Sequence, residues 1–185
     1  APGASGEQAS EATTLDVSRN PARRQERLAE EISAAIANEP SPETRFSIGT
    51  CRKWKGKDDT VRVRLMEWYT GRCQVCGRTF LQRNGQPYFE GLYLVPHTRA
   101  DWIDRPGNVV CLCPWHRAMF QFGSKTVVGD ILSRILAFIP KGLGGTTDPT
   151  LSVMLCGEET TIKFTEDHFL DLRAMISESV KTQTQ

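Results

Sequence analysis

Apolar residues recur with helical spacing in five stretches of the chain. The expected helices cover about residues 20–37, 60–70, 114–122 and 127–139, and a last helix begins after Thr165. Capping residues stand at three of the starts: Asn20 before Pro21, Asp59 or Thr60, and Thr165. The alternation in VRVRL also allows a strand near residue 63, although the following MEWYTG favours a helix. The expected inward positions are Leu28, Ile32, Ala35 and Ile36, then Val61, Leu65 and Trp68, then Ile131, Ile135 and Phe138, and finally Phe169, Leu172 and Ile176.

Short apolar runs between these helices predict strands. Residues 79–82 and 88–95 flank Asn84-Gly85, a pair typical of a two-residue hairpin turn. Residues 108–112 form a further short apolar segment. LSVMLC and TIKF, at residues 151–156 and 161–164, predict a C-terminal β-hairpin. Together with the helices, these strands predict an α+β fold in which flanking helices surround a small ββα centre.

Length and composition indicate one globular domain with an appendage. The chain has 185 residues, of which 39% are hydrophobic and 24% are charged. We expect a flexible linker at 1–19, a helix and basic connector at 20–58, a metal-binding domain at 59–140 and a packed extension at 141–185. The start at Ala1 suggests a piece of a larger protein. No membrane span or signal sequence is apparent, so a cytoplasmic location is expected.

Charge is distributed unevenly, although the formal net charge is only +1. Between Arg45 and Arg83, ten basic residues face three acidic ones, whereas the chain from Gly157 onward carries a net charge of −3. This asymmetry allows two interpretations. Either a basic surface meets an anionic partner such as nucleic acid, or both faces are simply solvated.

Two residue pairs with metal-ligand spacing are the strongest chemical signal. Cys73 and Cys76 are separated by two residues, as are Cys113 and His116. Three thiolates and one imidazole predict a closed tetrahedral Zn²⁺ site, which would be structural because no coordination position stays open. An iron–sulfur cluster would more often use four thiolates. The other cysteines, Cys51, Cys111 and Cys156, are interpreted as ordinary thiols; Cys111, two residues before Cys113, is the ambiguous one.

The sequences GRCQVCG and RPGNVVCLCPWH, within residues 71–122, give the chain a resemblance to the HNH, or ββα-metal, nuclease family. The same stretch is similar to the zinc-bearing C-terminal region of large bacterial proteins with ATPase-like modules. The resemblance implies a zinc-stabilised ββα core. It also implies a histidine acting as general base, an asparagine that orients it, and a histidine on the helix that holds a catalytic divalent ion.

The chain departs from this family pattern at two of the three positions. Asn108 matches the asparagine, but the base position falls on Tyr93 and the helix histidine on Arg117. A tyrosine with a pKa near 10 is deprotonated in only about one part in a thousand at pH 7. An arginine stays protonated and cannot ligate a cation. His97, with Asp101 and Asp104 nearby, is conceivable as a substitute site; the simpler interpretation makes these three polar loop residues.

Three functions follow, and enzymatic activity stays open among them. The first is a degenerate module that binds nucleic acid or a partner protein. The second is an active HNH endonuclease that uses His97, Asn108 and Mg²⁺ or Mn²⁺. The third is a structural domain that docks on an upstream domain or forms a homo-oligomer. Trp54, Trp102 and Trp115 are candidates for base stacking. The candidate phosphate contacts are Arg62, Arg64, Arg72, Arg78, Arg83, Arg99, Arg105 and Arg117.

Overall fold

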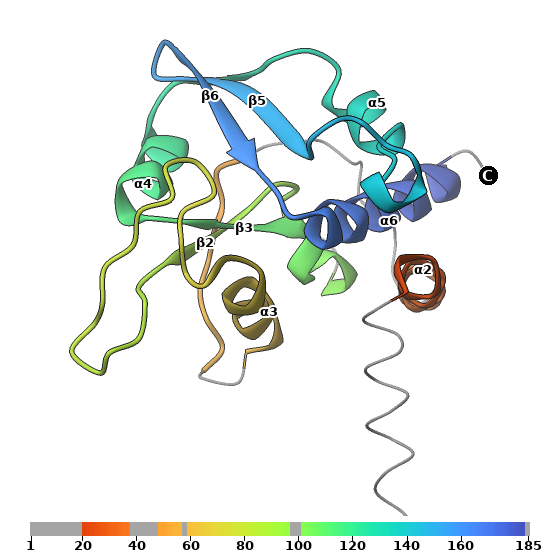
Figure 1. Cartoon of the computed structure of the whole chain (residues 1–185), viewed down its shortest axis with the longest axis horizontal. Coiled ribbons are helices and arrows are strands. Elements are labelled where there is room, and N and C mark those ends of the chain that lie inside the picture. The colour runs from red at the N-terminus through yellow and green to blue at the C-terminus, as the bar shows by residue number, and fades with distance from the viewer. Residues whose placement is uncertain (1–19, 38–47, 57–58, 97–100, 184–185) are drawn as a thin grey trace, which may run out of the picture.

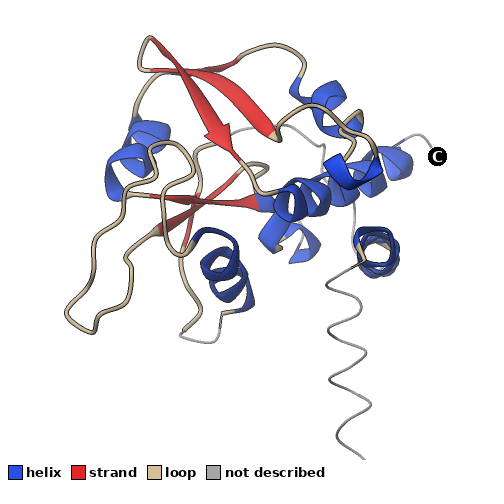
Figure 2. Cartoon of the chain, in the orientation of Figure 1, coloured by secondary structure: helices blue, strands red, loops and turns tan. Residues whose placement is uncertain are grey.

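Helices and two small sheets make up the part of the chain described by the computed structural model, residues 20–37, 48–56, 59–96 and 101–183. The predicted α+β class is confirmed (Figure 2). The expected linker at 1–19 lies outside the described residues. No helix among them is long and apolar enough to cross a membrane. The α-helices are α2 (Pro21–Ile36), α3 (Thr60–Tyr69), α4 (Pro114–Phe122), α5 (Ile131–Leu136) and α6 (Glu166–Gln183).

The first sheet contains β1 (Cys51–Arg52), β2 (Glu90–Tyr93) and β3 (Val109–Leu112), in that order and antiparallel throughout. Gly91 of β2 lies opposite Cys111 of β3. The chain then passes directly from β3 into α4, because Pro114 occupies the first turn of that helix. Two antiparallel strands followed by a helix are therefore present at this point of the fold (Figure 1).

The second sheet contains β4 (Lys125–Val127), β5 (Thr150–Leu155) and β6 (Glu158–Lys163), also antiparallel. The predicted C-terminal hairpin is confirmed, and its turn lies at Cys156 and Gly157, both with positive φ. The helix α6 follows the hairpin as expected. Its start is capped by Thr165, whose Oγ1 accepts a hydrogen bond from the backbone N–H of His168 at 3.2 Å.

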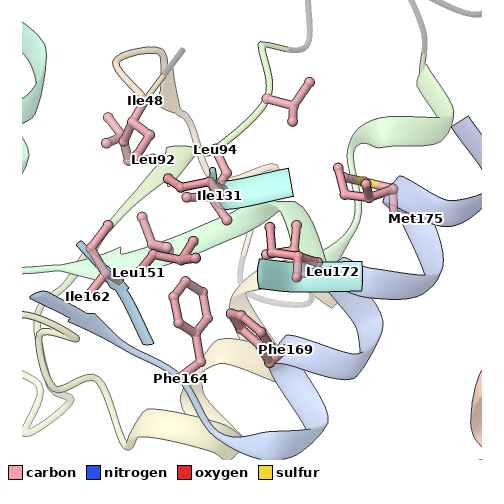
Figure 3. Packing of buried hydrophobic residues seen from close by; sticks show 14 of the residues in the cluster. Ile48, Leu92, Leu94, Ile131, Leu151, Ile162, Phe164, Phe169, Leu172 and Met175 are labelled. Atoms are coloured by element: carbon pink, nitrogen blue, oxygen red, sulfur yellow. The ribbon is translucent and has the colours of Figure 1, made fainter. Parts of the chain in front are cut away.

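The main hydrophobic core lies between the two sheets and α6. Leu92 and Leu94 from the β2 segment meet Leu151 and Ile162 from the second sheet, and Phe169 closes the cluster from α6 (Figure 3). These residues come from positions far apart in the sequence. Burying them joins the ββα segment, the hairpin and α6 into one packed unit.

A second, smaller core lies on the opposite face of the first sheet. Val61 and Leu65 of α3 pack there against Phe89, Tyr93 and Val109. Strand residues therefore alternate between two buried faces, and all four residues of β3 are buried. This arrangement directs Tyr93 toward the start of α3.

The other predicted helices and caps are largely confirmed. Asn20 caps α2 through its Oδ1, which accepts from Ala22 and Arg23. Asp59, not Thr60, caps α3, and the strand alternative for this segment is wrong. Of the expected inward positions, Ile32, Ile36, Val61, Leu65, Ile131, Ile135, Phe138, Phe169, Leu172 and Ile176 are buried, and Leu28, Ala35 and Trp68 are partly buried.

Two predicted elements are wrong in extent. The helix expected at 127–139 is only α5, because Lys125–Val127 pairs with β5 and Gly129 has a φ of 75°. The strand expected at 79–82 is reduced to a single bridge between Leu81 and Pro87. Two backbone bonds flank this bridge, from the N–H of Gln82 to the carbonyl of Gln86 and from the N–H of Tyr88 to the carbonyl of Phe80, and β2 pairs with β1 and β3 instead.

Candidate metal centre and its surroundings

The predicted ligand pairs meet at one point between the end of α3 and the start of α4. The Sγ atoms of Cys73, Cys76 and Cys113 and a ring nitrogen of His116 all lie within 4.8 Å of one another. The separation is 3.9 Å between the sulfurs of Cys76 and Cys113 and 3.5 Å from Cys73 Sγ to His116 Nδ1. Tetrahedral zinc would set neighbouring ligand atoms about 3.5 to 3.8 Å apart. The four donors thus form a candidate Cys3His site with the dimensions of a tetrahedral metal.

Local backbone geometry explains how each pair is presented. Gly77 adopts a φ of 71° and donates its N–H to the carbonyl of Cys73 at 2.8 Å, which closes the turn that carries the two cysteines. On the other side, Cys113 is the residue before α4 and His116 lies in its first turn. The two pairs therefore come from a tight turn and from a helix start, both held by backbone hydrogen bonds.

The donor set fits a soft or borderline divalent metal such as zinc. Burial raises the pKa of the Cys73 thiol to about 12, so metal binding there must displace a proton. Burial, together with the charge of Arg78, lowers the pKa of His116, which keeps the imidazole neutral and able to ligate. Because the protein supplies all four ligands, such a metal would stabilise the fold and leave no open position for a substrate.

Gln74, inside the cysteine turn, connects the metal centre to both sheets. Its side-chain Oε1 accepts from the N–H of Cys111 at 2.7 Å, and its Nε2 donates to the carbonyl of Lys163 at 2.8 Å. Its backbone N–H donates to the carbonyl of Cys111 at 2.9 Å, and its backbone carbonyl accepts from the N–H of Lys163 at 3.0 Å. Gln74 is buried and is a contact that the sequence pattern did not indicate.

The remaining cysteines lie outside the candidate site. Cys111 is fully buried against α3, and burial raises the pKa of its thiol. Cys51 is half-buried and contacts Gln121 through its Sγ at 3.3 Å. Cys156 is exposed in the β5–β6 turn.

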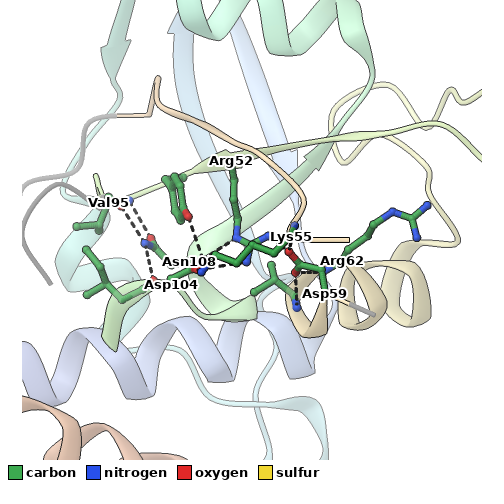
Figure 4. Close-up of polar contacts among 10 residues, drawn as sticks. Arg52, Lys55, Asp59, Arg62, Val95, Asp104 and Asn108 are labelled. Atoms are coloured by element: carbon green, nitrogen blue, oxygen red, sulfur yellow. Dashed lines mark hydrogen bonds and ion pairs between the residues drawn. The ribbon is translucent and has the colours of Figure 1, made fainter. Parts of the chain in front are cut away.

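Tyr93, the residue at the expected base position, belongs to a buried ion cluster. Its hydroxyl donates to Asp104 at 2.9 Å, and Arg52 donates to both oxygens of the same carboxylate at 2.6 and 3.2 Å (Figure 4). Arg52 also pairs with Asp59 at 2.7 Å, and Lys55 reaches Asp104 at 2.8 Å. The side chains of Arg52, Asp59 and Asp104 are only 4%, 1% and 7% exposed.

The electrostatics of this cluster oppose proton transfer at Tyr93. Burial raises the pKa of Tyr93, and its hydrogen bond to Asp104 raises it further. Burial alone would raise the pKa of Asp104, but the hydrogen bonds from Arg52 and Lys55 lower it well below the usual range. The cluster therefore holds a protonated tyrosine and an ionised carboxylate around one arginine.

Asn108 holds the backbone at two positions, one after β2 and one before β3. Its Oδ1 accepts from the N–H of Val95 at 2.8 Å, and its Nδ2 donates to the carbonyls of Val95 and Ile103 (Figure 4). Asn108 is fully buried. Its side-chain bonds in this structure hold the backbone at Val95 and Ile103 rather than a catalytic base.

The structure separates the predicted phosphate-contacting arginines into two groups. Arg64, Arg105 and Arg117 form ion pairs with acidic residues; in the case of Arg117 the partner is Glu90, at 2.6 Å. Arg62 lies over the ring of Phe89 at 5.4 Å. The second group is exposed, forms no ion pair among the described residues and lies in one segment at and after the cysteine turn: Arg72, Arg78 and Arg83.

Of the other two histidines, one lies outside the described residues and the other is buried in the core. His97, proposed as a substitute base, and Arg99 lie outside the described residues. His168, in the first turn of α6, is fully buried: its ring stacks on Trp68 with centroids 4.7 Å apart, and its Nδ1 lies 2.6 Å from the hydroxyl of Tyr69. Its backbone takes part in the α6 cap, but its side chain is a core residue.

Comparison of the chain with protein-family models, with curated proteins and with solved structures finds no match. The class of site is thus defined by its own geometry: a candidate Cys3His metal centre in an α+β fold.

Proposed function

We propose that the chain is a zinc-stabilised, HNH-like module of a larger protein that binds nucleic acid without cleaving it. The order β2, β3, α4 and the four ligands at the turn and the helix start support the HNH-like part of this proposal. Both features are those that the sequence resemblance implies.

The contacts of Tyr93 support the absence of cleavage. A general base must lose its proton near neutral pH, and Tyr93 is held in the protonated form as a donor to Asp104. The adjacent carboxylates, which could otherwise bind a divalent cation, are already neutralised by Arg52. Arg117, in place of the helix histidine, is paired with Glu90. Arg52 and Arg117 therefore supply positive charge in the region where the family pattern would place a metal cation.

The observation that carries the nucleic-acid part is the separation of the arginines. Most arginines of the region neutralise a carboxylate or lie on an aromatic ring, whereas Arg72, Arg78 and Arg83 are exposed without an ion pair among the described residues. Exposed guanidinium groups gathered in one segment are suited to phosphate contacts.

Three measurements on one purified sample test this function. Elemental analysis should find about one zinc per chain. Plasmid incubated with Mg²⁺ or Mn²⁺ should remain intact, and cleavage that is lost in His97→Ala would favour the active endonuclease instead. Gel-shift affinity should fall steeply with salt, because phosphate contacts release counterions. Absence of any binding to nucleic acid at low salt would refute the proposal.

The triple variant Arg72→Gln, Arg78→Gln, Arg83→Gln should lose most of the affinity and reduce the salt slope by about two to three. Arg64→Gln and Arg105→Gln serve as matched controls, because each removes an arginine that is already paired. An equal loss in the controls would indicate that net charge alone, and not this segment, determines binding.

A further inference from the structure

The outward face of α4 carries apolar side chains where a surface helix normally carries polar ones. Trp115 is 71% exposed and Phe122 is 77% exposed. They are seven residues apart on a regular helix, so they lie on one face about 10 Å apart along its axis. Ala118 and Met119, between them, are partly exposed, while Phe120 on the opposite face is buried. This outer face is suited to contact with a flat, apolar partner.

Trp115 is the most exposed of the three candidate stacking tryptophans. Trp54 packs against Phe89 with ring centroids 5.2 Å apart, and Trp102 is buried in the main core. Trp115 lies between the candidate ligands Cys113 and His116, in the first turn of α4. The metal centre therefore fixes the backbone from which this exposed indole projects.

Positive charge that forms no ion pair with the described residues flanks the Trp115 end of the helix. Arg72 and Arg78 bracket the cysteine turn, and Arg72 donates to the carbonyl of Gly77 at 3.3 Å. The shared metal site brings this turn against the start of α4, since the sulfurs of Cys76 and Cys113 are 3.9 Å apart. Figure 1 shows α4 at the edge of the molecule beside this loop. An aromatic face next to exposed guanidinium groups complements a nucleotide, which offers a base and a phosphate together.

The Phe122 end carries both signs of charge, because Lys125 donates through its Nζ to the carbonyl of Phe120 at 2.6 Å. Gly123 lies against Cys156 of the β5–β6 turn, and Glu158 and Glu159 are exposed beyond that turn. These carboxylates would repel phosphate. A backbone bound along α4 is therefore expected to lie on the side of the cysteine turn and to direct only its bases toward Phe122.

From these observations we infer that the nucleic acid is bound as a single strand, with bases stacked on Trp115 and Phe122 and phosphates on Arg72 and Arg78. This inference rests on the proposed function and adds the form of the ligand. In a duplex, the faces of the bases are covered by their neighbours, so a side chain can stack only on bases that are unpaired and splayed. Stacking on the rings of Trp115 and Phe122 therefore needs the unpaired bases of a single strand.

Anisotropy of labelled single-stranded DNA and RNA, and of the matching duplex, tests the inference on the full zinc-loaded chain. Wild type should prefer single strands, and Trp115→Ala and Phe122→Ala should each weaken single-strand binding about 5- to 150-fold. Trp115→Phe should retain most of the affinity. Leu143→Ala removes a similarly exposed apolar side chain far from α4 in sequence and should bind as wild type does. Zinc content and unfolding midpoint confirm that each variant is folded.

The outcomes separate this inference from the function on which it rests. Equal binding of duplex and single strand, with no effect of Trp115→Ala, would overturn the inference and leave the proposed function standing. Absence of binding to every nucleic acid would overturn both. A further outcome is that Trp115→Ala abolishes self-association in sedimentation and leaves nucleic-acid affinity unchanged. The face would then be an interface between copies of the chain, and the inference would be wrong.

Discussion

Replacing Arg52 by methionine should be among the most destabilising single changes outside the apolar core. The guanidinium donates to Asp59 at 2.7 Å and to Asp104 at 2.6 and 3.2 Å, and all three side chains are almost entirely buried. Methionine keeps much of the length of the side chain but removes its charge. Two buried carboxylates then face each other across an apolar side chain.

Removing one partner of a buried ion pair typically costs about 3 to 5 kcal/mol. The lower end of this range, about 3 kcal/mol, applies here because both carboxylates keep other donors. Asp59 still accepts from the N–H groups of Val61 and Arg62, and Asp104 still accepts from Lys55 and Tyr93. A loss of this size is a large fraction of the total stability of a typical domain.

Urea denaturation of the zinc-loaded protein, followed by tryptophan fluorescence, measures this loss. Lys55→Met is the matched control, because it removes a cation from the same carboxylate of Asp104 at an exposed position and should leave the midpoint nearly unchanged. Adding Asp104→Asn to Arg52→Met should recover part of the stability, because it removes one of the two buried negative charges that Arg52 had neutralised. If Arg52→Met costs no more than Lys55→Met, or if Asp104→Asn makes the first variant worse, the buried-charge argument is refuted.

Three further changes have outcomes that follow from single contacts. Gly107→Ala should cost about 1 to 3 kcal/mol, because its Cβ would lie 2.7 Å from the backbone of α6, whereas Gly142→Ala, which meets nothing, should be neutral in the same urea experiment. Burial lowers the pKa of His168 to about 3, so the unfolded state binds a proton that the native state refuses, and stability should fall by up to about 1.4 kcal/mol per pH unit as pH drops from about 6.5 toward 3. His168→Gln should flatten this slope, and an unchanged slope would show that other groups cause it. Cys76→Ser should lose zinc by elemental analysis, whereas Cys156→Ser should retain it.

Features encoded over a few residues could be predicted from the sequence. The two ligand pairs each span four positions, and the caps at Asn20, Asp59 and Thr165 act within one helical turn. Such contacts depend only on spacing and residue type, which a sequence displays directly. For the same reason, the turn at Gly157 and the inward face of α6 could be assigned before the structure.

Features that depend on distant partners could not be predicted. Arg52 and Asp104 are separated by 52 positions, and nothing in the basic stretch around Arg52 distinguishes the residue that becomes buried. Likewise, Lys125–Val127 has a weak intrinsic strand signal and becomes a strand because the edge of β5 is available to pair with it. Gln74 is an unremarkable polar residue until both sheets approach it.

Two separate features adjoin the first sheet: the buried Arg52 cluster and the candidate metal centre. At one end, Tyr93 and Val109 are opposite each other and the Arg52 cluster lies nearby; at the other, Leu112 leads into Cys113 and the candidate metal. Strands of only four residues gain little from their own ladder, so both ends need such support.

Three of the proposed binding residues lie beside the candidate metal centre. Arg72, Arg78 and Trp115 are on the segments that carry the ligands, whereas Arg52 lies opposite Gly91 on the outer strand β1 and directs its side chain into the buried cluster with Asp59 and Asp104. At a temperature where both variants are folded, Arg52→Met should therefore bind single strands with wild-type affinity, whereas Cys76→Ser should lose that affinity together with its zinc. Anisotropy titration after checking the fold by circular dichroism distinguishes the two. Equal loss in both variants would mean that the Arg52 cluster and the candidate metal centre act as one unit and that the binding surface is not confined to the segments that carry the ligands.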